Sequence, residues 1–172
     1  MTIGLHPVLY TLSPKKVVSL EADFEYHIIM EHLHAIAISE FMTRDLIVLG
    51  PDETMADAYQ KMHSHHIRHL PVVDDEGNIT GIFTQEDLQR AYPAHETESG
   101  WYYDKRELEL LNLRHFMSSS VTTLTPENTL KEASEIMIRN KYGCIPIVSA
   151  GSKKLIGIVS YIDILKKIDS LF

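Results

Sequence analysis

Residues 69–88 read HLPVVDDEGNITGIFTQEDL, residues 144–165 read CIPIVSAGSKKLIGIVSYIDIL, and these two stretches decide the fold. Each contains an apolar run with a central proline, a polar turn with a glycine, a second apolar run and the pattern Gly-x-x-Thr/Ser-x-x-Asp. Two apolar runs that flank such a turn predict a β-hairpin. Because the unit occurs twice, we expect a fold built from two equivalent halves.

The repeat extends upstream of both hairpins. Matched residues lie 75 positions apart before the second turn and 76 apart after it, which a one-residue insertion in that turn explains. The matched pairs are Met42 with Met117, Pro51 with Pro126, Thr54 with Thr129, Ala58 with Ala133, Met62 with Met137, Pro71 with Pro146, Gly81 with Gly157, and Asp87 with Asp163. So many ordered matches indicate an internal duplication.

Each repeat is expected to hold three short strands and two helices. The first helix begins at a capping box, formed by Thr54 with Asp57 in one repeat and by Thr129 with Glu132 in the other. A second helix closes the unit, and in the second repeat Ile162, Leu165 and Ile168 predict its inward stripe. The expected strands are Leu46–Leu49, His69–Val73 and Ile79–Thr84, then Val121–Leu124, Cys144–Val148 and Lys154–Ser160.

Such a unit cannot cover both faces of its own sheet, but two units packed together can. We therefore predict an α/β (α+β) fold in which the two repeats form one body with pseudo-twofold symmetry. The expected organisation is an N-terminal extension over 1–37, a first repeat over 38–92, a linker over 93–112 and a second repeat over 113–172. Part of Val17–Ala37 is expected to be helical and to dock on the core or over a cleft, and the linker to be helical near Leu108–Leu111.

Composition excludes several classes of protein. The 172 residues carry a net charge of −8, which argues against broad binding to nucleic acid or to an anionic membrane. The single cysteine, Cys144, excludes an intrachain disulfide and a cysteine-based zinc site. No apolar run approaches the ~18 residues of a membrane span, and no signal peptide is evident. The sequence thus predicts a cytoplasmic protein.

The repeated pattern resembles the cystathionine-β-synthase (CBS) domain, and two in tandem resemble a Bateman module, with a weaker similarity to stand-alone bacterial proteins of the acetoin-utilisation type. The resemblance implies a non-catalytic regulatory, energy-sensing module that binds AMP, ADP or ATP in clefts between the repeats. S-adenosylmethionine, NAD or a cyclic dinucleotide are further ligands of this class, and no cofactor is required. A homodimer and a separate effector protein are the implied partners.

The resemblance also implies the binding residues. Asp87 and Asp163 would accept hydrogen bonds from ribose hydroxyls, and Thr84 and Ser160 would meet phosphate. A carboxylate has the acceptor geometry for a vicinal diol, which supports the first role. The cleft of Asp87 would be completed by Ile82, His69, Thr122, Thr123 and Gly143, and that of Asp163 by Ile158, Cys144, Ile47, Val48, Ile67 and Arg68.

In the Asp87 cleft the resemblance puts open space beside Gly143 and an imidazole at His69 that can gain charge near phosphate. The Asp163 cleft has the uncharged Cys144 at the matching position and must borrow Arg68. We therefore expect the Asp87 cleft to bind more tightly. A homodimer is expected because apolar side chains exceed what one core needs. The residues counted as surplus are Met55, Met62, Ile138, Leu165 and Leu171.

Other interpretations compete with ligand binding. Thr84-x-x-Asp87 and Ser160-x-x-Asp163 are also helix capping boxes, which need no ligand. The module could then be structural or serve protein interactions, with empty or degenerate clefts. The histidines at 63, 65, 66 and 69 straddle a helix end and a strand, so their side chains should diverge rather than hold a metal. Cys144 is expected to be a small buried residue, and no catalytic motif is present.

Overall fold

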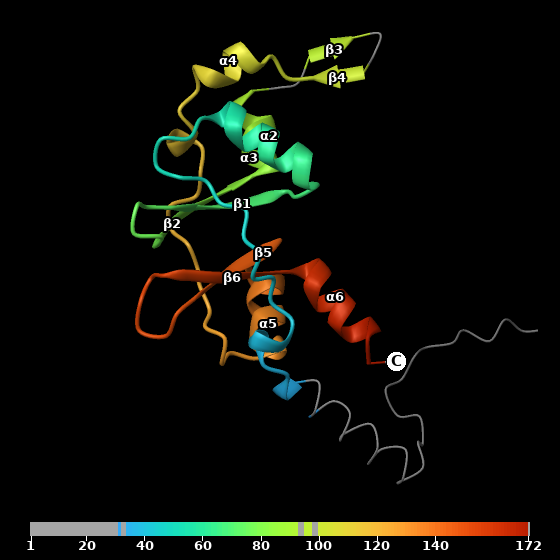
Figure 1. Ribbon diagram of the computed structural model, residues 1–172. Coiled ribbons are helices and arrows are strands. Elements are labelled where there is room, and N and C mark those ends of the chain that lie inside the picture. Colours follow the sequence, from blue (N-terminus) through green and yellow to red (C-terminus); the bar gives the residue numbers. More distant parts are fainter. Residues whose placement is uncertain (1–30, 32–33, 93–94, 98–99, 172) are drawn as a thin grey trace, which may run out of the picture.

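The computed structural model describes residues 31, 34–92, 95–97 and 100–171. Each half consists of one antiparallel hairpin and two helices, and in Figure 1 the two hairpins lie next to each other between the helices. The first half contains α2 (Met55–His65), β1 (His69–Val73), β2 (Ile79–Thr84) and α3 (Gln85–Ala91). The second contains α5 (Leu130–Asn140), β5 (Cys144–Val148), β6 (Leu155–Ser160) and α6 (Tyr161–Asp169). The duplicated architecture confirms the predicted fold class.

The segments between and before these halves hold shorter elements. They are η1 (Ile38–Glu40), β3 (His95–Thr97), β4 (Gly100–Tyr102), α4 (Lys105–Glu109) and η2 (Leu113–His115). The helix α4 begins earlier than predicted because the Asp104 side chain caps it by accepting a hydrogen bond of 2.9 Å from the Arg106 amide. The helix predicted within Val17–Ala37 lies outside the described residues except for its last positions.

The two hairpins have the same register. Cys144 lies opposite Ser160 as His69 lies opposite Thr84. The register of each hairpin shifts at the equivalent place, between Val72 and Val73 and between Ile147 and Val148. The turns contain Gly77 at φ 79° and Gly151 at φ 74°, conformations that favour glycine. The last residue of each hairpin, Thr84 or Ser160, is also the N-cap of the helix that follows.

The predicted third strand of each repeat is wrong in extent. Within Leu46–Leu49 and Val121–Leu124 only Leu49 and Leu124 pair, each in a parallel bridge to the central part of its hairpin. In the first repeat the Val48 carbonyl accepts a hydrogen bond of 2.7 Å from the Lys61 ammonium instead of from a strand. A single bridge therefore replaces a ladder.

The two repeats exchange their leading segments. Ile36, Ile38 and Met42 precede the first hairpin but belong to the core of the second half, whereas Leu108 and Leu113 belong to the core of the first. In Figure 1 α4 lies beside α2. The Leu130 amide at the start of α5 donates to the Ile36 carbonyl at 2.8 Å, which holds the other segment against the second half. Each core therefore includes a segment that leads into the other hairpin, and the two halves are not independent.

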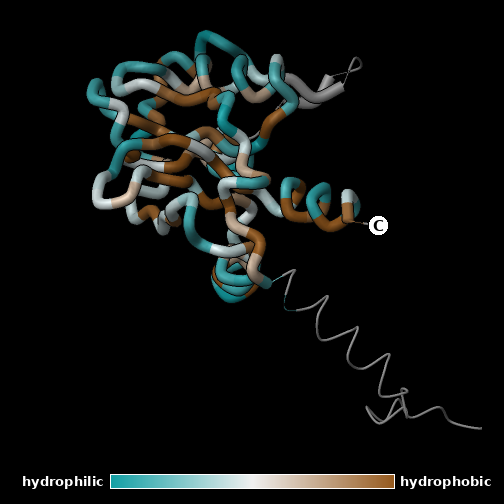
Figure 2. Tube along the Cα trace, turned by 60° about the horizontal axis from the view of Figure 1, so that its bottom comes forward, coloured by the Kyte–Doolittle hydropathy of each residue, from teal (hydrophilic) through white to brown (hydrophobic). Residues whose placement is uncertain are grey.

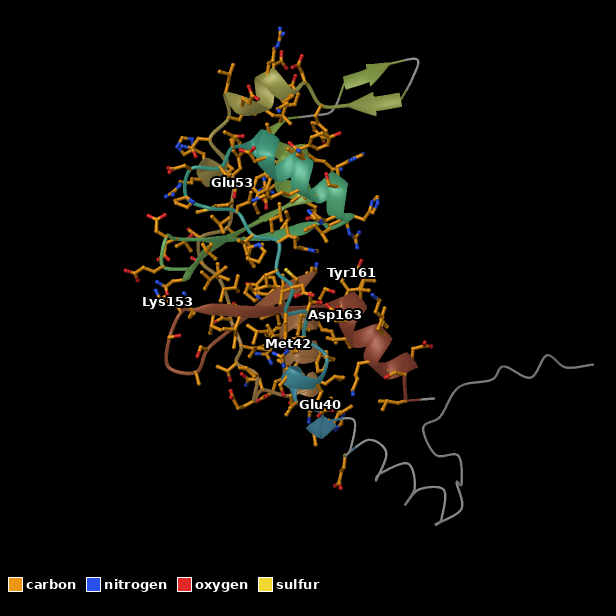
Figure 3. The ribbon with its side chains drawn as sticks, viewed as in Figure 1. Glu40, Met42, Glu53, Lys153, Tyr161 and Asp163 are labelled. Carbon is orange, nitrogen blue, oxygen red and sulfur yellow. The ribbon has the colours of Figure 1, made fainter. Side chains whose placement is uncertain are left out.

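The exchanged segments also pair across the repeats. The Thr43 amide donates to the Ile158 carbonyl at 2.9 Å, and the Ser118 amide donates to the Ile82 carbonyl at 3.0 Å. The two hairpin turns are joined as well, because the Ile79 amide donates to the Lys153 carbonyl at 2.9 Å; Figure 3 labels Lys153 at this turn. Pseudo-twofold symmetry thus extends to the contacts between the halves.

Most apolar segments lie in the middle of the molecule, between more polar outer ones (Figure 2). The helix α6 departs from the predicted stripe, since Ile162 is 40% and Leu165 58% exposed. Ile164 is buried instead, and with Ile168 it packs against the second core. Ile164 and Ile168 lie four residues apart and so share one face of the helix, and this face packs against the second core. In the described part of the chain no helix has the length and apolarity to cross a membrane.

Candidate functional site

A cavity of about 910 Å³ lies between the two halves. On the side of the first repeat, polar side chains come from α3 and its N-cap, and from Arg68 and His69 at the start of β1. The facing wall comes from the second repeat, from the segment before α5 and the turn between α5 and β5. The lining residues are Arg68, His69, Ile82, Thr84, Gln85, Glu86, Asp87, Gln89, Arg90, Ser118, Ser120, Val121, Thr122, Met137, Ile138, Lys141, Tyr142, Gly143, Cys144 and Tyr161.

Asp87 is the buried charge of this cavity, with 5% of the residue exposed. Its Oδ2 accepts hydrogen bonds from the Thr84 amide at 2.9 Å and the Thr84 hydroxyl at 2.7 Å. Its Oδ1 accepts from the guanidinium of Arg90. The capping box predicted for this motif is therefore formed, and a diol reaching Asp87 would compete with Arg90 for Oδ1.

Asp163 has a different set of partners. It closes the equivalent box by accepting from the Ser160 amide at 2.7 Å and the Ser160 hydroxyl at 2.6 Å. Its Oδ1 accepts from the Thr43 hydroxyl at 3.2 Å, and Thr43 belongs to an exchanged segment. In Figure 3 Asp163 lies near the start of α6. The two carboxylates thus share the cap but differ in their third donor.

The imidazole of His69 occupies the space where a side chain on Gly143 would lie. The expected open space beside Gly143 is therefore wrong, because histidine from the other repeat fills it. Burial, with the nearby Arg68 charge, lowers the pKa of His69, although Glu86 and Asp87 oppose this shift. This shift favours the neutral imidazole in the ligand-free protein, and the gain of charge beside a phosphate stays a prediction.

Arg68 and Cys144 lie in the same cavity as Asp87, whereas the sequence assigned both to the Asp163 cleft. Arg68 does so because its guanidinium donates a hydrogen bond across the cavity to the phenol oxygen of Tyr161. Cys144 is 5% exposed, which confirms the expected small buried residue. Burial raises the pKa of its thiol to about 12, so it is unreactive at neutral pH.

Eight of the fifteen predicted site residues line this cavity. They are Arg68, His69, Ile82, Thr84, Asp87, Thr122, Gly143 and Cys144. The other seven do not line it: Ile47, Val48, Ile67, Thr123, Ile158, Ser160 and Asp163. Ile47 and Ile67 pack against the first core instead. The structure therefore brings together most of one predicted cleft and assembles it from both repeats.

Several lining residues were missed by sequence reasoning. Arg90 and Tyr161 gave no signal, because each acts through a contact that only the fold creates. Ser118 could have been found, because it lies 75 residues after Thr43 and both carry a hydroxyl. Thr43 and Ser118 lie at equivalent positions, each on a segment that crosses to the other repeat. Such a pair predicts a hydroxyl beside each of the two clefts.

The histidine-rich segment runs from the end of α2 to the start of β1. In the ranges that the structure describes, no three His, Cys, Asp or Glu side chains gather where they could hold a metal ion. His63 and His65 are exposed on α2, and His66 ends that helix in a left-handed conformation at φ 53°. The chain therefore turns between these side chains and His69.

Comparisons with known proteins agree with this architecture. The family model described as CBS domain matches residues 38–94 and 113–170. The chain is similar to the structure of AcuB from Vibrio cholerae, at 31% identity and a TM-score of 0.65, which covers 79% of this chain and 92% of that one. It is also similar to the structure of MJ1225 from Methanocaldococcus jannaschii, at 28% identity and a TM-score of 0.67, which covers 84% of this chain and 52% of that one.

Among curated sequences, MJ1225 is 31% identical over 135 residues, which cover 75% of this chain and 46% of MJ1225. A homoserine O-acetyltransferase from Methanosalsum zhilinae is 28% identical over 149 residues, which cover 87% of this chain but 27% of the enzyme. The chain thus spans less than half the length of these two relatives, so their whole activities do not transfer with the match. With both repeats matched by the family model and reproduced in the fold, the chain belongs to the CBS domain family and forms a tandem CBS pair.

Proposed function

We propose that this CBS pair is a non-catalytic regulatory module that binds an adenine nucleotide in the cavity between its repeats. The observation that carries the proposal is Asp87, a carboxylate with 5% exposure in a cavity of about 910 Å³ walled by both repeats. A ligand held there touches both halves at once. Its binding free energy can therefore shift their relative packing, which is the requirement for a signal.

The cavity offers a distinct surface for each part of a nucleotide. Ile82, Val121 and Met137 supply apolar surface for a flat base. The carboxylate of Asp87 fits a ribose diol, because it accepts from two donors. Arg68 and Lys141 line the same cavity and carry the positive charge that a phosphate needs.

Structures with this fold are described with such ligands. One CBS pair, MJ0100, is described in complex with 5′-methylthioadenosine and S-adenosyl-L-methionine, and another protein, CBSX2, in complex with AMP. At 19% and 22% identity they share only the fold with this chain. The proposed ligands are AMP, ADP or ATP, with S-adenosylmethionine, NAD and cyclic dinucleotides as further candidates. The argument for them therefore depends on this chain's own residues.

A thermal-shift panel of these ligands tests the proposal. A ligand at ~100 times its dissociation constant adds ~2.7 kcal/mol to the free energy of unfolding. For a chain of this size we expect the melting temperature to rise by roughly 5–10 °C. The matched variants Asp87→Asn and Asp163→Asn keep the side-chain shape, and each is compared with and without ligand, so any change in basal stability cancels.

We expect Asp87→Asn to remove most of the rise and Asp163→Asn to remove less, because the Asp87 cleft is proposed to be the tighter. Calorimetric titration of both variants then measures the two affinities directly. If Asp163→Asn abolished the tighter phase while Asp87→Asn left it intact, the order of the clefts would be reversed. No shift with any ligand would remove the nucleotide proposal.

Two observations favour the alternative, a structural or protein-interaction module. Both oxygens of Asp87 already have donors without a ligand, from Thr84 and Arg90. In addition, Ile138 and Leu165 expose 79% and 58% of their surface on the helices of the second repeat. No thermal shift with any ligand of the panel, together with a stable protein complex through the surface of Ile138 and Leu165, would support the alternative.

A further inference from the structure

A polar contact between two side chains that line the cavity joins the first repeat to the second. Arg68, just before β1, donates a hydrogen bond from its guanidinium to the phenol oxygen of Tyr161, the first residue of α6. The same guanidinium lies over the tyrosine ring, 5.7 Å from the ring centroid. Both side chains line the cavity of Asp87. Figure 3 labels Tyr161 at the end of α6 nearer the first repeat.

The contact has no pseudo-symmetric counterpart. The repeat relates Arg68 to Gly143 and Tyr161 to Gln85, so the equivalent position on the other side has neither a cation nor a ring. The duplication therefore did not supply this pair, and it belongs to one cleft alone.

Three other basic side chains line the cavity of Asp87: Lys141, which also carries positive charge for a phosphate, Arg90 and His69. Arg90 forms an ion pair with Asp87 itself, and burial lowers the pKa of His69, which favours its neutral imidazole. Arg68, by contrast, is bound to a neutral phenol. A phosphate offers the guanidinium an opposite charge and two oxygens for bidentate pairing, whereas the phenol offers one uncharged oxygen. A phosphate in the cavity would therefore be a better partner for Arg68 than Tyr161 is.

We propose that Tyr161 holds the guanidinium of Arg68 in the ligand-free protein, and that the phosphate of a bound nucleotide displaces the phenol. The proposal deepens the proposed function and rests on it. Tyr161 is then a competitor of the ligand, and it lowers affinity only for ligands that carry a phosphate. Adenosine, which has the same base and ribose but no phosphate, does not exchange with the phenol.

Calorimetric titration of AMP and of adenosine into the full chain tests this exchange. Tyr161→Phe keeps the ring over Arg68 and removes only the hydroxyl. Since a net hydrogen bond contributes about 1 kcal/mol, we expect AMP to bind roughly 3- to 10-fold more tightly and adenosine to be unchanged. Arg68→Gln is expected to weaken AMP binding by tenfold or more, again with adenosine unchanged.

The double variant Arg68→Gln/Tyr161→Phe is the control. With glutamine at 68 there is no guanidinium to hold, so removal of the hydroxyl should leave AMP affinity equal to that of Arg68→Gln alone. Circular dichroism checks that each variant is folded. If Arg68→Gln fails to fold, Arg68→Lys keeps the charge without the planar guanidinium, and Tyr161→Phe should then have a smaller effect on AMP in that background.

The possible failures are distinct. AMP affinity that is unchanged or weaker in Tyr161→Phe, or an equal gain for adenosine, overturns the exchange and leaves the nucleotide site intact. If the wild type binds neither AMP nor adenosine, the proposed function fails for these ligands and the exchange with it.

Discussion

The glycine of each Gly-x-x-Thr/Ser-x-x-Asp motif is explained by the exchanged segments. A Cβ on Gly81 would lie 2.7 Å from the Met117 sulfur, and one on Gly157 would lie 2.8 Å from the Met42 sulfur. Both distances are far inside ordinary contact. A hydrogen at these positions therefore lets the crossing segment pack directly on the strand.

Gly81→Ala and Gly157→Ala are expected to lower the free energy of unfolding by about 1–3 kcal/mol each, because overpacking forces the methionine or the strand to move. Gly50→Ala is the control, since its Cβ would lie 3.6 Å from the Glu53 carboxylate, an ordinary contact. Urea denaturation at neutral pH measures all three. A loss as large at Gly50 as at Gly81 would show that the crossing segment is not the cause.

His69 makes stability depend on pH. Burial, followed by the Arg68 charge, lowers the pKa of His69 in the folded state below the 6.5 of a free histidine. Between these two pKa values the unfolded chain holds more protons at this site than the folded chain, so stability rises with pH. The contribution is complete above pH 6.5 and decreases as the pH falls toward the folded-state pKa.

We expect His69→Gln to flatten the pH dependence of the free energy of unfolding between pH 7.5 and 5.5. Urea denaturation at several pH values across this window measures the slope. The control is His65→Gln, which changes an exposed histidine of α2 and should keep the slope of the wild type. Equal slopes in the wild type and His69→Gln would contradict the assignment.

At the scale of elements, local sequence and tertiary packing have separable roles. The capping boxes at Thr54 and Thr129 begin α2 and α5 at the predicted residues, and β1, β2 and β5 match their predicted bounds. These signals are local, since a cap joins residues three apart and a hairpin joins neighbours. The short runs before α2 and α5 were overestimated as strands because their partners are set by the whole repeat.

Because the leading segments are exchanged, a substitution in one of them should destabilise the other repeat. Ile38 is fully buried in the second core and Leu113 is 2% exposed in the first. Replacing either by alanine should cost about 2–5 kcal/mol, as for other buried aliphatic residues. We expect Ile38→Ala to raise amide exchange mainly in β5 and β6, and Leu113→Ala mainly in β1 and β2.

Hydrogen–deuterium exchange with each variant as the control of the other measures this pattern. Sequence position alone would give the reverse result, because Ile38 begins the first repeat and Leu113 the second. Faster exchange in the nearer repeat of each variant would therefore contradict the exchange of segments.

For the whole molecule, the argument for a homodimer needs correction. Met55 and Met62, counted as surplus in the sequence, are buried in the first core. The surplus comes instead from Ile138, Leu165 and Leu171, which are 79%, 58% and 40% exposed on or next to α5 and α6. The surplus side chains that are exposed thus all belong to the second repeat, and an isologous contact between two copies would bury them.

Light scattering at micromolar concentration should give twice the mass of one chain. Ile138→Asp with Leu165→Asp is expected to convert the protein to a monomer without loss of helix signal, because the charges would face each other across the contact. Leu110→Asp is the control: Leu110 is 85% exposed but follows α4, beside the first repeat. A monomer in the wild type would exclude the dimer at these concentrations.

The sequence by itself determined the duplication, the hairpins, the caps and the carboxylate pair Asp87 and Asp163. These follow from residue type and spacing within a few positions of each other, where backbone geometry leaves few choices. Composition also limited the binding partners, since the net charge of −8 disfavours a broad polyanion surface.

Only the tertiary structure decided which core each leading segment joins, that His69 fills the space over Gly143, and that Arg68 bonds to Tyr161. The contacts of His69 with Gly143 and of Arg68 with Tyr161 join residues more than seventy positions apart in the chain. The sequence pattern of a repeat is the same whether its leading segment packs on its own core or on its neighbour's. The choice is made by the packing of both halves together, because it buries apolar surface that neither half could cover alone.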